Sequence, residues 1–224
     1  MSTFRRVFSS TVGTKLLIGL TGLLLFAYLL LHLAGNLIIF AGQDAFNQYS
    51  HALISNPLIA PIEIGLLLIF LLHIYKAIAN YVRNQRARPI GYQKKEWAHH
   101  TSRKSVSSTT MIWTGLVILF FVLIHVSQFK YGAYYAIGNP PIRDLYRTEV
   151  DVFHSPVWVA FYVVCVILVG FHLRHGVSSA FQSLGLDQPA WTRFIRPAGK
   201  VIAVLVAGGF IAIALWAHFA GVPS

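Results

Sequence analysis

Long apolar stretches without a single charge alternate with short hydrophilic segments along this chain. A fifth apolar stretch, at about residues 58–81, carries Glu63 near its start and Lys76 near its end, where long side chains can reach an interface. Each stretch is long enough for a helix that crosses a hydrocarbon core, which takes about 20 residues. The pattern predicts an all-α integral membrane bundle of five transmembrane helices. The four uncharged stretches are residues 16–43, 105–129, 152–173 and 201–224.

The remaining sequence is too short for a separate soluble domain, so we expect one membrane domain over residues 1–224. The composition agrees, since 56% of the residues are hydrophobic and only 11% are charged, against about 25% charged in soluble domains. The first stretch is too long for a signal-peptide core and no small-residue cleavage site follows it, which indicates a retained helix. The expected spans are approximately 14–40, 58–81, 107–129, 154–175 and 200–221.

The net charge of +11 is distributed unevenly. If five spans alternate in direction, residues 1–15, 76–104 and 174–200 share one side and hold 15 of the 18 Lys and Arg residues, whereas five of the seven acids lie opposite. The positive-inside rule then places the N-terminus in the cytoplasm and the C-terminus outside. The basic surface is therefore expected to face anionic lipid or an acidic partner subunit, and no nucleic-acid partner is needed to explain it.

Four of the spans each contain a histidine: His32, His73, His125 and His172. A histidine in a transmembrane helix is costly, and it indicates a functional site. Two pairs of imidazoles in a bundle are the pattern expected for axial ligands of two b-type haems. The single cysteine, Cys165, lies in the fourth span and no CxxCH motif is present, so such haems would be held by coordination alone.

Depth in the membrane decides which histidines can pair. The odd-numbered spans run outward and place His32 and His125 in the outer half, here called the outer level. The even-numbered spans run inward and place His73 and His172 in the inner half, the inner level. Because two imidazoles must face one iron at a similar depth, we predict one haem at each level, with the levels about 15 Å apart at a helical rise of about 1.5 Å per residue.

Other polar residues near the inner level are candidates for lesser roles. His175 follows His172 by three residues and is an alternative fourth ligand. It could instead contact a haem propionate, and the same role is open to other basic residues at the inner rim. These are Arg174, Lys76, Arg103 and Lys104.

The chain resembles a known family in the segments LHLAGNLIIF around His32, LLHIYKAIANY around His73 and GFHLRHGVSSAFQSLGL around His172. It is similar, from about residue 10 to 220, to the five-helix, two-haem cytochrome b subunit of succinate:quinone oxidoreductases and quinol:fumarate reductases, the membrane anchors of respiratory complex II. The resemblance places ligands on the same four histidines. Within the segment FHLRHG it favours His172 over His175.

The resemblance also implies partners and substrates. It implies a FAD-bearing dehydrogenase subunit and an iron–sulfur subunit on the cytoplasmic side of a bacterial cytoplasmic (inner) membrane. Electrons from succinate would pass through two haems b to a quinone, with menaquinone favoured, or in reverse during fumarate reduction. The chain itself would carry out no dicarboxylate chemistry.

Two acidic positions bear on quinone chemistry. Some relatives carry a glutamate two residues before the fourth-span ligand, where this chain has Gly170, so we do not predict that proton route. Relatives also place an acid near the outer haem. By depth the candidates are Glu63 and Asp44, for which anchoring at the interface is the simpler role.

Two other classes of protein remain open at this point. The chain could be the two-haem cytochrome b subunit of another membrane dehydrogenase, although one ligand on each of the first four of five spans disfavours this. It could also be a haem-free transporter or proton channel that uses the histidines as relays. Such a protein should show buried acids or broken helices at the midplane, and the sequence has neither.

Overall fold

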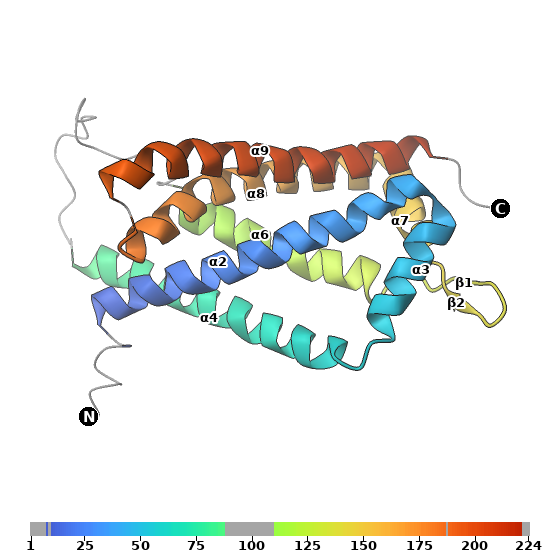
Figure 1. The fold of residues 1–224 in the computed structure, drawn as a ribbon, viewed down its shortest axis with the longest axis horizontal. Coiled ribbons are helices and arrows are strands. Elements are labelled where there is room, and N and C mark those ends of the chain that lie inside the picture. Colours follow the sequence, from blue (N-terminus) through green and yellow to red (C-terminus); the bar gives the residue numbers. More distant parts are fainter. Residues whose placement is uncertain (1–7, 9, 88–109, 187, 221–224) are drawn as a thin grey trace.

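Five long helices lie side by side and form a bundle (Figure 1). The computed structural model describes residue 8 and residues 10–87, 110–186 and 188–220. All five helices are long and apolar enough to cross a membrane. The predicted all-α membrane bundle is therefore confirmed. The helices are α2 (Thr11–Asn36, extended by the 3-10 helix η1, Leu37–Ala41), α4 (Ile59–Arg86), α6 (Met111–Phe129), α8 (Pro156–Ser183) and α9 (Pro189–Phe219).

Local sequence explains where several helices begin and how far they extend. The Ser10 hydroxyl caps α2 by accepting a hydrogen bond of 2.9 Å from the Gly13 amide. α8 begins with Pro156, whose missing amide proton is not needed in a first turn. α4 continues past its apolar part as far as Arg86, because basic residues in a last turn interact favourably with the helix dipole.

The end of the bundle opposite the N-terminus carries additional short elements (Figure 1). Two helices there, α3 (Gln43–Ile54) and α7 (Leu145–His154), are too short to span a membrane. An antiparallel pair of two-residue strands, β1 (Ala136–Ile137) and β2 (Ile142–Arg143), precedes α7. The hydropathy pattern did not predict α3 or α7, which it left in the connections between spans.

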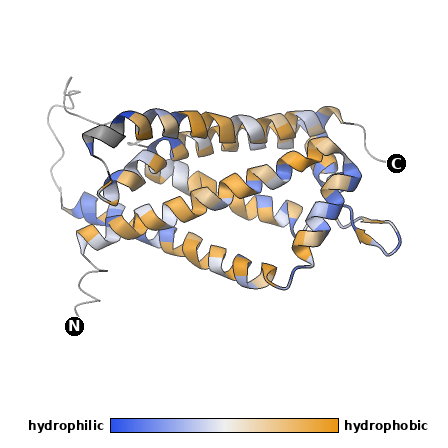
Figure 2. Cartoon of the chain, in the orientation of Figure 1, coloured by the Kyte–Doolittle hydropathy of each residue, from blue (hydrophilic) through white to orange (hydrophobic). Residues whose placement is uncertain are grey.

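The buried core lies between α2, α7, α8 and α9. Its larger buried side chains include Ile39, Val150, Tyr162 and Val206. By contrast, α4 contains no buried residue, although it is 28 residues long. Hydrophobic residues make up most of the length of the five long helices, whereas hydrophilic residues gather toward the ends of the bundle (Figure 2). α4 therefore presents apolar surface that the rest of the described chain does not cover.

Candidate functional site

The outer level brings together two histidines from two helices. His32 of α2 and His125 of α6 have ring centroids 5.7 Å apart, with their planes at 90°. Tyr28 stacks on His32 at 5.6 Å, and Phe210 of α9 lies 5.7 Å from the same ring. The outer level is thus an aromatic environment with two imidazoles at its centre.

The ring nitrogens of the two outer histidines have different surroundings. The side-chain nitrogen of Asn36 donates to the backbone oxygen of His32 at 2.7 Å and lies 3.3 Å from its Nδ1. His125 Nδ1 is buried and has no hydrogen-bond partner in the part of the chain that the structure describes. Its ring is packed instead among aromatic side chains, which are Phe121, Phe129 and Tyr162.

The inner level brings together His73 of α4 and His172 of α8, which are close enough to interact electrostatically. Each imidazole meets a threonine on the preceding odd-numbered span. Thr21 Oγ1 of α2 lies 3.0 Å from His73 Nδ1, and Thr114 Oγ1 of α6 lies 3.1 Å from His172 Nδ1. Both threonines are buried. The two inner histidines therefore have the same kind of polar neighbour, in contrast to the outer pair.

A glycine follows each threonine and lies against the same imidazole. A Cβ atom added to Gly22 would stand 3.2 Å from His73 Cε1, and one added to Gly115 would stand 3.5 Å from His172 Cε1. The first distance is tighter than ordinary van der Waals contact. The Thr-Gly pairs were not among the predicted site residues, although the sequence holds a signal: each pair begins 11 residues before the histidine of its own helix.

The structure places three of the basic residues predicted at the inner rim. His175 lies one turn beyond His172, is half-buried and interacts with it electrostatically, whereas Arg174 is exposed. Lys76 Nζ donates to the Phe8 backbone oxygen at 3.2 Å. The remaining two propionate candidates, Arg103 and Lys104, lie outside the described residues.

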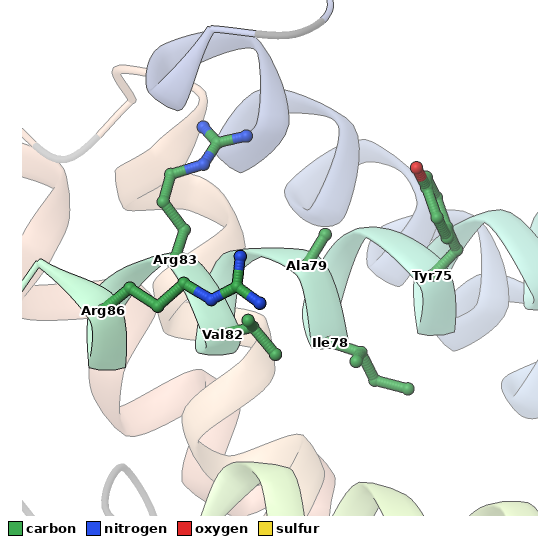
Figure 3. A pocket seen from close by; sticks show the side chains of 6 residues that line it. All are labelled: Tyr75, Ile78, Ala79, Val82, Arg83 and Arg86. Carbon is green, nitrogen blue, oxygen red and sulfur yellow. The ribbon is translucent and has the colours of Figure 1, made fainter.

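A groove of about 410 Å³ lies along the surface of α4 near its C-terminal end (Figure 3). Its lining includes none of the four candidate histidines. We therefore do not assign it to the candidate site. The groove is lined by Tyr75, Ile78, Ala79, Val82, Arg83 and Arg86.

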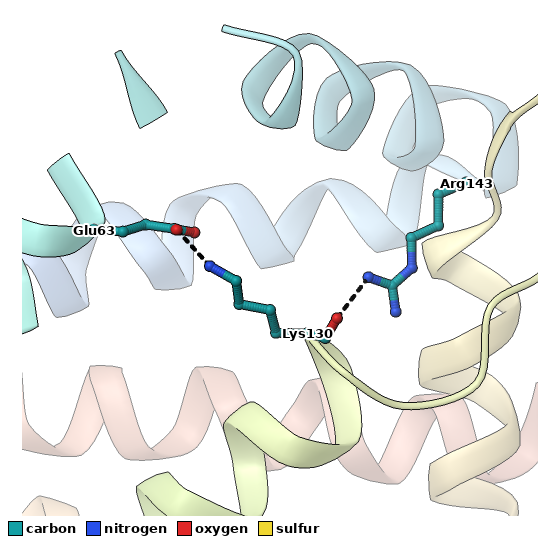
Figure 4. Close-up of polar contacts among 3 residues, drawn as sticks. All are labelled: Glu63, Lys130 and Arg143. Atoms are coloured by element: carbon teal, nitrogen blue, oxygen red, sulfur yellow. Dashed lines mark hydrogen bonds and ion pairs between the residues drawn. The ribbon is translucent and has the colours of Figure 1, made fainter. Parts of the chain in front are cut away.

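The two acids predicted near a quinone lie toward the end of the bundle that carries α3 and α7. Glu63 forms an ion pair with Lys130, which joins the start of α4 to the end of α6 (Figure 4). It also interacts electrostatically with Tyr28, the side chain that stacks on His32. Asp44 is exposed in the first turn of α3. Of the two, Glu63 is linked to the outer level through Tyr28.

A buried acid that sequence reasoning missed lies in α7. Glu149 is 6% exposed, and it interacts electrostatically with Tyr162, whose ring contacts His125. Burial raises the pKa of Glu149 to about 8. Within the described residues, no group of three or more His, Cys, Asp or Glu side chains could hold a metal ion.

Comparison with known proteins finds two curated relatives. The succinate dehydrogenase cytochrome b558 subunit of Bacillus subtilis is 25% identical over 161 residues, which are 71% of this chain and 72% of that protein. The succinate dehydrogenase hydrophobic membrane anchor subunit of Thermoplasma acidophilum is 26% identical over 77 residues, 34% of this chain and 58% of that protein. No protein-family model matches the chain, and no solved structure matches it significantly. The predicted resemblance to complex II membrane anchors is confirmed by these two relatives.

Proposed function

We propose that this chain is the membrane-anchor subunit of a succinate:quinone oxidoreductase and that it holds two haems b, one at each histidine level. The observation that carries the proposal is the arrangement of four histidines from four consecutive spans as two pairs, one with ring centroids 5.7 Å apart and one near enough for an electrostatic interaction. The relatives support the coarser part, since both are named as succinate dehydrogenase membrane subunits.

The side chains at each level fit a bis-histidine haem. A metal–imidazole bond is about 2 Å long, so two imidazoles on opposite sides of one ion have ring centroids about 6 Å apart. The separation of His32 and His125 is 5.7 Å. At the inner level, the hydrogen bonds found for His73 and His172 within the described part of the chain involve Nδ1. The Nε2 of each of these two rings is thereby left as the nitrogen available to an iron.

The packing of α4 also fits two flat apolar cofactors. A 28-residue helix without a buried residue lacks the packed face that stabilises a bundle helix. α4 carries His73, so a porphyrin at the inner level would lie against it. The glycine at position 22 keeps the edge of this imidazole free of a Cβ contact.

When bound, haem b supplies one-electron redox chemistry at its iron. The chain's own residues hold the two cofactors at fixed depths and surround them with apolar side chains, which sets how easily each is reduced. We place the iron–sulfur and FAD-bearing partner subunits at the basic, cytoplasmic end. We place the quinone, with menaquinone favoured, near Glu63 and Tyr28, where a carboxylate is available to accept a proton released by a quinol.

A haem assay on the purified full-length chain tests the proposal. The pyridine haemochrome method, with reduced-minus-oxidised spectra, should give about two haems b per chain. His73→Ala and His125→Ala should each remove about one, because each level loses a ligand. His51→Ala, which changes an exposed histidine of α3, should leave the haem content unchanged. A folded wild-type chain without haem would overturn the proposal and favour a transporter or channel.

A second assay separates succinate dehydrogenase from other membrane dehydrogenases. In the complex isolated from its native membrane, succinate should reduce part of the haem b within the assay, and formate or hydrogen should not. Reduction by formate or hydrogen alone would reassign the chain to another dehydrogenase.

A further inference from the structure

We propose that Thr21 and Thr114 are positioning residues that fix the tautomers of His73 and His172, so that Nδ1 carries the proton and Nε2 presents its lone pair to a metal. Each threonine acts within a Thr-Gly pair that receives an imidazole from a neighbouring helix. The identity of the metal group rests on the proposed function, whereas the tautomer is a property of the chain alone.

The Thr21 hydroxyl donates its proton to a backbone carbonyl of its own helix. Thr21 Oγ1 lies 2.6 Å from the Leu17 backbone oxygen, a distance at which two oxygen atoms without a proton between them repel each other. The hydroxyl has one proton, so it donates to Leu17 and keeps its lone pairs for other partners. His73 Nδ1, 3.0 Å away, must then be the donor. A neutral imidazole protonated at Nδ1 has a bare Nε2.

A parallel inference applies at the second threonine, where no oxygen contact is as short as that of Thr21. Thr114 Oγ1 lies 3.2 Å from the Thr110 backbone oxygen and 3.1 Å from that of Met111, and we infer that its proton points at these two acceptors of its own helix. His172 Nδ1, at 3.1 Å, is left to donate to the hydroxyl oxygen. Both inner histidines are therefore set in the form that ligates through Nε2.

The outer level does not share this arrangement. The nitrogen of the Asn36 amide faces His32 Nδ1 and is a donor, while its bond to the His32 backbone oxygen fixes the amide in that orientation. His125 Nδ1 is buried, and no described residue bonds to it. Among the described residues neither outer imidazole has an acceptor at Nδ1, so we infer that the ligand tautomer is preset at the inner level and not at the outer one.

The two Thr-Gly pairs occupy equivalent places in the two odd-numbered spans. Thr21 precedes His32 by 11 residues, and Thr114 precedes His125 by 11 residues. Eleven residues are about three turns and about 16 Å of helix, so each threonine shares a helix face with its own outer histidine. α2 and α6 therefore each provide one outer histidine and one Thr-Gly pair that contacts an inner histidine.

Nitrogen NMR of the haem-free, full-length chain with 15N-labelled histidine tests the tautomers directly. Wild type should show His73 and His172 protonated at Nδ1. Thr21→Val should remove the preference at His73 only, and Thr114→Val at His172 only, whereas Thr21→Ser should keep it. Thr14→Val, another buried threonine of α2, is the matched control and should change neither. Wild-type signals protonated at Nε2 for both residues would overturn the proposal.

Haem binding tests the positioning role. Partners of metal ligands typically contribute about 10- to 100-fold to affinity, so Thr21→Val should weaken retention of the inner haem by about that factor, shift its reduction potential and spare the outer haem. Thr21→Ser should restore both properties. Unchanged inner-haem retention and potential in both valine variants would overturn the role of the threonines. A wild-type chain that binds no haem would overturn the proposed function and leave the NMR result standing.

Discussion

Glu149 shows how one side chain couples the end of the bundle that carries α3 and α7 to pH. It is a carboxylic acid buried in α7, and it lies near enough to Tyr162 to act on it electrostatically. Burial disfavours its charged form and raises its pKa from 4.5 to about 8. The folded chain therefore keeps this proton over a range in which the unfolded chain releases it.

This difference predicts the pH dependence of stability. Between about pH 4.5 and pH 8 the folded state binds more protons, so the free energy of unfolding should fall as pH rises, by up to about 1.4 kcal/mol per unit. Glu149→Gln should flatten this slope. Thermal unfolding in detergent at pH 5, 6.5 and 8 measures it, with the exposed Glu63→Gln as control. Equal slopes in wild type and Glu149→Gln would contradict the assignment.

At the residue scale, the sequence was sufficient for the histidines and insufficient for their neighbours. His32, His73, His125 and His172 were identified because an imidazole in an apolar span is costly. A threonine in such a span is common, since its hydroxyl can bond to its own helix, as Thr21 does. Only the packing of one helix on another shows which threonine also meets an imidazole.

At the element scale, a polar cluster joins the two short helices α3 and α7 at their shared end of the bundle. Asp144 caps α7 by accepting from the Arg147 amide at 3.0 Å, and it also accepts from the side chains of Gln43 and Asn47 at 2.7 Å each. Asn47 in turn accepts from the Tyr146 amide at 3.0 Å. Asp144 and Asn47 are both buried, so the hydrogen bond between them satisfies two polar groups that have little access to water.

Removal of the central carboxylate should destabilise this end of the bundle. Asp144→Ala loses a helix cap and leaves the buried Asn47 amide without its acceptor, and the two losses together should cost about 2–4 kcal/mol. Asp44→Ala, at an exposed position in the first turn of α3, should cost less than about 1 kcal/mol. Thermal unfolding of the two variants provides the comparison. Equal losses would show that the cluster is not a stabilising unit.

The short helices explain what hydropathy could not predict about the elements. α3 and α7 contain only 12 and 10 residues and are moderately polar. A hydropathy pattern therefore predicts connections at these positions, between spans of about twice their length. Their stability comes from long-range contacts such as Asn47 to Asp144, which are 97 positions apart. A pattern within one segment carries no information about such a contact.

At the scale of the whole molecule, the bundle was predictable because five apolar stretches must each cross the hydrocarbon. The packing between them was less accessible from sequence. The apolar stretches of α4 and α8 are both long enough to span, yet α8 has several buried residues and α4 has none. The difference depends on which faces of the helices meet, and on the space that the candidate sites require.

The distribution of basic residues predicts how the molecule lies across the membrane. In a Cys165→Ser background, which removes the buried native thiol, Ser55→Cys should react with a membrane-impermeant thiol reagent in intact cells. Gln182→Cys, at the basic end of α8, should react only after permeabilisation. Both positions are exposed, so access depends on sidedness. The reverse labelling pattern would place the N-terminus outside.

In both α2 and α6, 11 residues separate the threonine of the Thr-Gly pair from the outer histidine. This spacing fixes the distance between the two levels and the helix face that they share. One inserted residue between Gly22 and His32 would turn the histidine by about 100° relative to Thr21, and four would displace it by about 6 Å. Substitutions among the intervening apolar residues leave this register intact. Residues 23–31 and 116–124 can therefore diverge in composition during evolution, but we expect selection to hold their lengths constant.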